Sequence, residues 1–112
     1  MALIVKTNIA TDLKQEIQKA IAEKKIDTWL IDDDGDFTHS PEQWFCKAWM
    51  RLVDIDEEKI LKFGIIGNKQ VRMTKSLYAI YHGRFAEMLL SHFDEEIDSI
   101  EITSNKTEFD YF

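Results

Sequence analysis

Apolar residues along the chain follow two different periods, and the change of period predicts the order of the elements. Over residues 12–25 they recur at three- and four-residue steps, as they do on one side of an α-helix. The same spacing returns from Thr74 or Ser76 to about His92 and predicts a longer helix. Between the two helices, short apolar runs separated by turn residues predict four antiparallel strands over residues 28–66.

Two segments near the chain ends carry weaker strand patterns, Ala2–Lys6 and Ile97–Thr103. We therefore expect an α+β fold: a four-stranded antiparallel meander flanked by an N-terminal helix and a long C-terminal helix, with room for one extra terminal strand. The length of 112 residues fits a single domain, in which residues 105–112 form a tail.

Asp34-Gly35 is the strongest turn signal in the chain, because Asp-Gly between apolar runs is typical of β-hairpins. A three-residue loop over residues 33–35 keeps the apolar residues on one face and pairs Ile31 with Phe37. The same register sets Asp32 opposite Asp36. Facing carboxylates destabilise a hairpin unless a cation or a basic side chain lies between them.

A second hairpin is predicted from residues 49–55 and 60–66, with the acidic loop Asp56–Lys59 between its strands. Both of its faces carry apolar residues. One face presents Met50, Leu52, Leu61, Phe63 and Ile65, and the other presents Trp49, Arg51, Val53, Ile55, Ile60, Lys62 and Ile66.

The long C-terminal helix is also apolar on two sides. One stripe consists of Leu77, Tyr81, Phe85, Met88 and His92, and the opposite side carries Ala79, Gly83, Ala86 and Leu90. Glycine inside a helix costs about 1 kcal/mol relative to alanine, so Gly83 predicts the close approach of another backbone.

Together these patterns predict more apolar surface than one helix covers. We therefore expect an interface with a protein partner or a second copy of the chain, formed by Trp49, Val53, Ile55, Ile60, Ile66, Ala79 and Gly83. The competing interpretation is that the N-terminal helix and the chain ends cover all of this surface.

Local capping signals mark two helix starts. Thr11 is a suitable N-cap for the first helix, and Ser40-Pro41 predicts a short helical turn after the first hairpin. His39 lies close to Trp29 in the preferred hairpin register, so we expect it to pack at the strand end. Cys46 lacks the basic surroundings of a reactive thiol.

Composition narrows the class of protein. The apolar run Ala2–Val5 is too short for a signal peptide, and nothing approaches the roughly 20 apolar residues of a membrane span. The single cysteine, Cys46, excludes an internal disulfide, which indicates a reducing compartment. We expect a cytoplasmic protein that does not bind membranes.

The charge is distributed unevenly. The net charge of −7 repels phosphates, so we expect no direct binding of nucleic acid. Residues 59–86 contain no acidic residue and six basic ones, which leaves −13 on the rest of the chain. Three of the basic residues, Lys69, Arg72 and Lys75, lie where the long helix begins, and they predict an anion-binding site.

The acidic turn is a candidate metal site through Asp32, Asp34 and Asp36, because carboxylate oxygens suit Ca²⁺ and Mg²⁺. A standard EF-hand is excluded. Its glycine at position six would be Gly35, which puts Leu30 at position one, where a carboxylate is required.

The run Leu30-Ile31-Asp32-Asp33-Asp34-Gly35 resembles the first motif of haloacid-dehalogenase-type phosphatases. The resemblance covers about ten residues and implies a nucleophile at Asp32, a general acid at Asp34, Mg²⁺ bridging to phosphate, and a parallel sheet.

No complete set of catalytic groups, metal ligands or cofactor contacts emerges from the sequence. We expect no cofactor, and we predict a small binding module that acts through protein contacts and self-associates as a homodimer. Two alternatives stay open. One is a metal-dependent phosphohydrolase that uses Asp32 and Asp34. The other is an acidic inhibitor or nucleic-acid mimic that acts on a nucleic-acid-binding partner, suggested by clusters at residues 32–36, 54–58 and 94–98.

Overall fold

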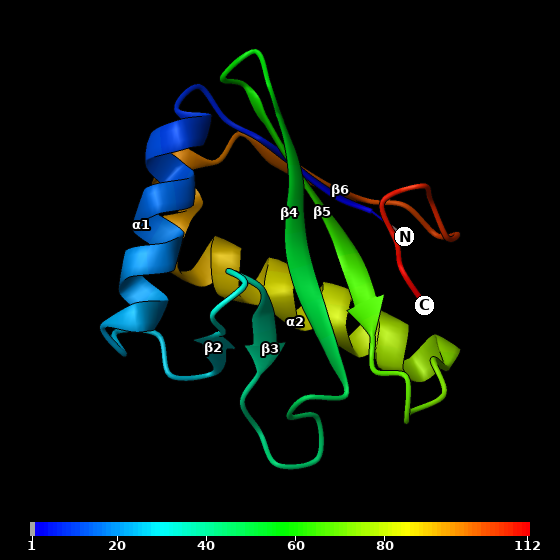
Figure 1. Ribbon diagram of the computed structural model, residues 1–112. Helices are drawn as coiled ribbons and strands as arrows, with labels where there is room; N and C mark the ends of the chain where they lie inside the picture. Colours follow the sequence, from blue (N-terminus) through cyan, green and yellow to red (C-terminus); the bar gives the residue numbers. More distant parts are fainter. Residues whose placement is uncertain (1) are drawn as a thin grey trace.

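A computed structural model describes residues 2–112 and shows two helices packed on one face of a six-stranded sheet (Figure 1). The elements follow in the order β1 (Leu3–Lys6), α1 (Ala10–Ala22), β2 (Trp29–Ile31), β3 (Phe37–His39), β4 (Ala48–Asp56), β5 (Ile60–Gly67), α2 (Lys75–Phe93), the 3-10 turn η1 (Asp94–Glu96) and β6 (Ser99–Ile102). The sheet order is β2-β3-β4-β5-β1-β6, and every strand pairing is antiparallel. The predicted α+β class is confirmed.

The predicted four-stranded meander is wrong in its strand count. The strands β2 to β5 form a meander, but β1 pairs with β5 and β6 pairs with β1, so both ends of the chain join the sheet. Leu3 lies between Phe63 and Ile102, its partners in the two neighbouring strands. In the sequence, each terminal strand is visible only as a short apolar run. Its place in the sheet was not predicted, because its pairing partners are far away in the sequence.

The first hairpin has the predicted three-residue loop. Ile31 pairs with Phe37, and the Asp32 amide donates to the Asp36 carbonyl at 2.9 Å. Gly35 has a φ of +83°, in the left-handed region that favours glycine. The register that keeps apolar residues on one face is therefore confirmed.

The predicted register of the second hairpin is confirmed near Met50, which pairs with Ile65, and it changes at a β-bulge. Beyond the bulge at Val53 the register shifts by one residue, so Ile55 pairs with Leu61. Because Leu61 is fully buried in the core, Ile55 turns to the core side as well. This corrects the prediction that Ile55 belongs to the opposite, interface-forming face.

The first helix begins at Ala10 and ends at Ala22, earlier at both ends than the predicted range 12–25. Ile9 occupies the N-cap position instead of Thr11, and no side chain of the helix start caps it. Glu58 in the β4–β5 loop supplies the missing acceptors: its carbonyl accepts from the Ala10 amide at 3.1 Å, and its carboxylate accepts from the Thr11 amide at 3.1 Å. The tertiary contact with Glu58 therefore satisfies amides at the helix start that a local side-chain cap would otherwise satisfy.

The second helix begins as predicted. The Thr74 hydroxyl accepts a hydrogen bond from the Leu77 amide at 3.0 Å, which makes Thr74 the N-cap. Ser40-Pro41 opens only a turn, in which the Trp44 amide donates to the Pro41 carbonyl at 2.8 Å before β4 begins.

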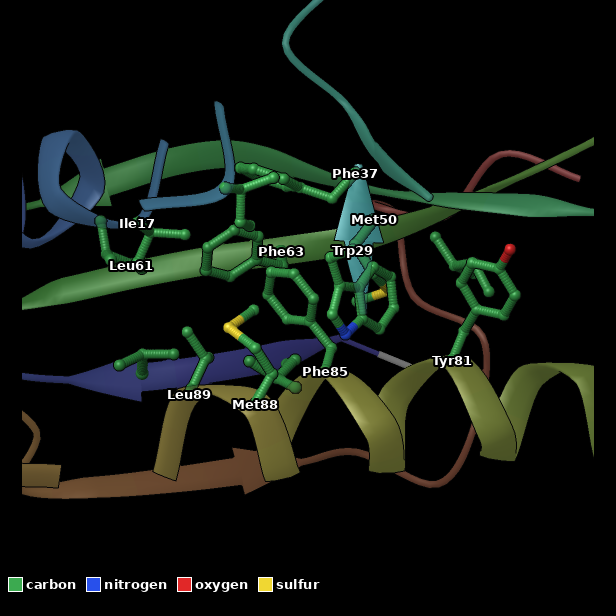
Figure 2. Close-up of a cluster of buried hydrophobic side chains, with 14 of the residues drawn as sticks. Ile17, Trp29, Phe37, Met50, Leu61, Phe63, Tyr81, Phe85, Met88 and Leu89 are labelled. Atoms are coloured by element: carbon green, nitrogen blue, oxygen red, sulfur yellow. The ribbon is translucent and has the colours of Figure 1, made fainter. Parts of the chain in front are cut away.

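An aromatic cluster at the centre of the core joins the sheet to both helices (Figure 2). Phe85 on α2 lies 5.0 Å, between ring centroids, from both Trp29 and Phe63. Ile17 on α1 and Leu61 on β5 lie at one end of the same layer. Because the buried residues of both helices belong to this one cluster, the core lies entirely on one side of the sheet.

Candidate functional site

The sheet has a second face that neither helix covers. We call it the open face and define it by Trp49, Val53, Ile60 and Ile66 on the central hairpin. All four side chains are half-buried, and none packs against the core cluster. In Figure 1, α2 crosses behind β4 and β5 while the near side of these strands carries no helix. The predicted apolar surface on this hairpin therefore exists, except for Ile55.

The C-terminal tail covers a small part of the open face. A Cβ added at Gly64 would lie 2.0 Å from the Phe109 carbonyl oxygen, so the tail rests directly on the glycine backbone. The tail also pairs with the end of β5: the Tyr111 amide donates to the Ile65 carbonyl at 2.9 Å, and the Gly67 amide donates to the Tyr111 carbonyl at 2.7 Å. This cover reaches Gly64 but leaves Trp49 and Ile66 half-exposed.

The charged residues of the open face are paired with one another. Arg51 forms two hydrogen bonds with Asp36, at 2.8 Å from Nε and 2.5 Å from a terminal nitrogen. Lys62 lies 4.0 Å from the carboxylate of Asp54. Although the whole chain carries −7, the centre of this face therefore has little net charge.

The candidate metal residues Asp32, Asp34 and Asp36 do come together, since one carboxylate oxygen from each lies within 4.8 Å of the others. However, these carboxylates are already used in the fold. Asp32 Oδ1 accepts from the amides of Asp34 and Asp36, at 3.0 Å and 2.9 Å, and Asp36 is held by Arg51. Arg51 thus compensates the facing carboxylates, and its hydrogen bonds with Asp36 raise its own pKa above the usual value.

The geometry around Asp32 differs from that implied by the resemblance to haloacid-dehalogenase-type phosphatases. Asp32 follows β2, which lies at the edge of the sheet and pairs antiparallel with β3. A parallel sheet, as that resemblance implies, is not found among the strands of residues 2–112.

Two of the three basic residues predicted to bind an anion line two adjoining clefts. Lys69 lines a cleft of about 620 Å³ between the β5–α2 loop and the tail, and Lys75 lines a neighbouring cleft of about 540 Å³. Arg72 is exposed and lines neither cleft. Lys106 and Phe112 line both clefts. Lys106 and Phe112 were not among the predicted site residues, although the aromatic and charged composition of the tail is visible in the sequence.

His39 packs against Trp29, as expected, with ring centroids 4.6 Å apart. Its Nδ1 lies 2.7 Å from the Thr28 carbonyl oxygen, and because a carbonyl only accepts, Nδ1 carries the proton. Burial lowers the pKa of His39 below its usual value, so the ring is neutral at pH 7. His39 borders a cleft of about 330 Å³ beside α2.

Comparison of the chain with models of protein families, with curated proteins and with solved structures finds no match. Within residues 2–112, neither helix is long and apolar enough to cross a membrane. Any functional conclusion therefore rests on the surfaces described above.

Proposed function

We propose that this protein is a small binding module that acts through protein contacts and self-associates through its open face. The observation that carries the proposal is the row of half-buried apolar side chains, headed by Trp49 and Ile66, on a sheet whose other face packs against the core. Tryptophan is enriched at the centres of protein interfaces, where its large ring excludes water. Trp49 and Ile66 are directly paired across β4 and β5, so they present one continuous apolar surface.

The charge distribution favours a second copy of the chain as the occupant. Two molecules that each carry −7 repel one another over most of their surfaces. The ion pairs Arg51–Asp36 and Lys62–Asp54 make the open face an exception, because each basic group there offsets an acidic one. A two-fold contact that brings the same patch of both copies together is the commonest form of self-association.

The predicted interface residues divide between two surfaces. Trp49, Val53, Ile60 and Ile66 belong to the open face, whereas Ala79 and Gly83 lie on the exposed side of α2, on the far side of the core. Within the chain nothing lies within 4 Å of a Cβ added at Gly83, so the close approach predicted there is not made by any described residue. A single two-fold contact uses one surface only, and we assign it to the open face.

Sedimentation of the purified protein tests the proposal. We expect a dimer at micromolar concentration, and we expect Trp49→Glu to give a folded monomer because it places a charge in the apolar centre of the contact. Leu90→Glu is the matched control, since Leu90 is 51% exposed on α2, away from the open face. A wild-type protein that stays monomeric throughout the micromolar range would overturn the proposal. So would a dimer that Trp49→Glu leaves intact.

A further inference from the structure

Three lysines line the two adjoining clefts beside the start of α2, and Lys106 is distant in sequence from the other two. Lys69 comes from the β5–α2 loop, Lys75 is the first residue of α2, and Lys106 comes from the tail. Within residues 2–112, no ion pair is formed by Lys69 or Lys75. Lys106 donates to a main-chain oxygen of Phe112 at 3.1 Å. Positive charge therefore collects here in a chain that is otherwise strongly acidic.

The start of α2 is electrostatically unfavourable as it stands. The positive end of a helix dipole favours acidic residues, and α1 has Asp12 in its first turn. The first turn of α2 contains no acidic residue and begins with Lys75 instead. An anion held between Lys75 and the neighbouring lysines would remove this repulsion.

The clefts also offer an aromatic wall. Phe112 is 50% exposed and lines both clefts. The Lys106 ammonium lies 4.6 Å from the centroid of the Phe112 ring. The centroids of the Tyr78 and Phe112 rings lie 5.9 Å apart. Met73 adds an apolar surface shared by the two clefts. A ligand here can stack a flat ring on Phe112 while its charged group reaches the lysines.

Asp110 also lines the larger cleft, but its carboxylate is turned to the protein. Its Oδ1 accepts from the Ile65 amide at 3.0 Å, and its Oδ2 accepts from the Thr107 amide at 2.8 Å and the Tyr78 hydroxyl at 3.3 Å. The Asp110 carboxylate is therefore bonded to donors of the fold.

We propose that these clefts form a binding site for a small organic anion that combines a flat aromatic ring with a phosphate or carboxylate group. Lys75, Lys69 and Lys106 hold the anionic group, and Phe112 supports the ring. The volumes of about 620 Å³ and 540 Å³ lie within the range of roughly 300–1,000 Å³ that is usual for small-molecule sites. Ile66 of the open face also lines the larger cleft, whereas Trp49 lines neither cleft.

Titration calorimetry, supported by amide chemical shifts, tests the proposal with four probes. Adenosine 5′-monophosphate and indole-3-acetate both carry a ring and an anion, and they distinguish phosphate from carboxylate as the anionic group. Adenosine lacks the anion, and inorganic phosphate lacks the ring. We expect at least one of the two ringed anions to bind about tenfold or more tightly than either adenosine or phosphate.

Matched variants locate the site. Lys75→Gln and Lys106→Gln should each weaken binding about fivefold or more, because each removes a charge-assisted contact. Lys59→Gln removes the same charge from the exposed β4–β5 loop and should leave binding unchanged. Phe112→Leu should abolish the preference for ringed anions. Binding should survive in Trp49→Glu, which separates this proposal from that of self-association.

Two results would overturn the inference. One is the failure of both ringed anions to bind at millimolar concentration. The other is binding that is as tight for phosphate alone, or that Lys75→Gln and Lys106→Gln do not change.

Discussion

Arg51 is the residue that makes the acidic hairpin compatible with the fold. The Asp36 side chain is 6% exposed and depends on Arg51 for two hydrogen bonds. A buried carboxylate without its partner keeps the cost of desolvation. At the residue scale, the facing carboxylates of Asp32 and Asp36 are thus explained by the Arg51 side chain from β4.

Replacing Arg51 by methionine should lower the free energy of unfolding by about 1–2 kcal/mol, an estimate reduced because Arg51 is itself partly exposed. Urea denaturation measures the change, and Asp34→Asn at the exposed loop tip serves as the control. Millimolar calcium should then stabilise Arg51→Met more than the wild type, because the variant leaves Asp32 and Asp36 uncompensated. Equal stability of Arg51→Met and the wild type would contradict this account.

The pH dependence of stability should contain a contribution from His39. Burial lowers the folded-state pKa of His39, while in the unfolded chain it returns to about 6.5. The unfolded state therefore binds the proton more readily, so this contribution is fully present above pH 6.5 and is lost as the pH falls through the lowered folded-state pKa.

His39→Asn is the useful comparison, because its amide can still donate to the Thr28 carbonyl but does not titrate. We expect the wild type to lose stability relative to His39→Asn as the pH falls below about 6.5, measured by urea denaturation at each pH. Because all other titrating groups are shared, parallel pH curves for the two proteins would contradict the assignment.

At the scale of the elements, Gly64 on β5 and Gly83 on α2 have opposite surroundings. A Cβ at Gly64 would meet the Phe109 carbonyl carbon at 2.6 Å, while one at Gly83 would meet nothing within 4 Å. The β5–tail contact therefore depends on glycine, and α2 does not.

Gly64→Ala should displace the tail from β5. Hydrogen exchange at the Tyr111 amide, which donates to the Ile65 carbonyl, should become faster, and stability should fall. Gly83→Ala is the matched control and should raise stability by up to about 1 kcal/mol, as expected inside an exposed helix. Unchanged exchange at Tyr111 in Gly64→Ala would show that the tail is not held by this contact.

The sequence predicted most elements, because each depends on residues that are close together in the chain. The Asp34-Gly35 turn, the Thr74 N-cap and the apolar stripe that buries Phe85 all follow from spacings within a few residues. The bulge at Val53 was missed, and with it the inward turn of Ile55, since no turn or composition signal marks it. The start of α1 was also missed, because its acceptor is Glu58, 47 residues away from Thr11.

At the scale of the whole molecule, two helices on one face leave the second face of the sheet to the tail and to solvent. If the proposed self-association occurs there, mass action makes the Tm rise with protein concentration in the wild type but not in Trp49→Glu. The same arrangement places the basic clefts around the tail and the start of α2, and Ile66 borders both the open face and the larger cleft.

The candidate sites show the same division between local pattern and tertiary structure. The cluster of Lys69, Arg72 and Lys75 is visible in the sequence because the three residues are neighbours in the chain. Lys106 and Phe112 join that cluster only because the tail returns to the end of β5.

By itself, the sequence determined the α+β class, the presence and order of the two helices, the first hairpin and the uneven charge, because periodicity and turn chemistry act over a few residues. Only the tertiary structure decided that β1 lies between β5 and β6, that Arg51 neutralises Asp36, and that one face of the sheet stays open. Those outcomes depend on contacts between segments that are far apart in the chain. The pattern of neighbouring residues does not predict the free energies of such contacts.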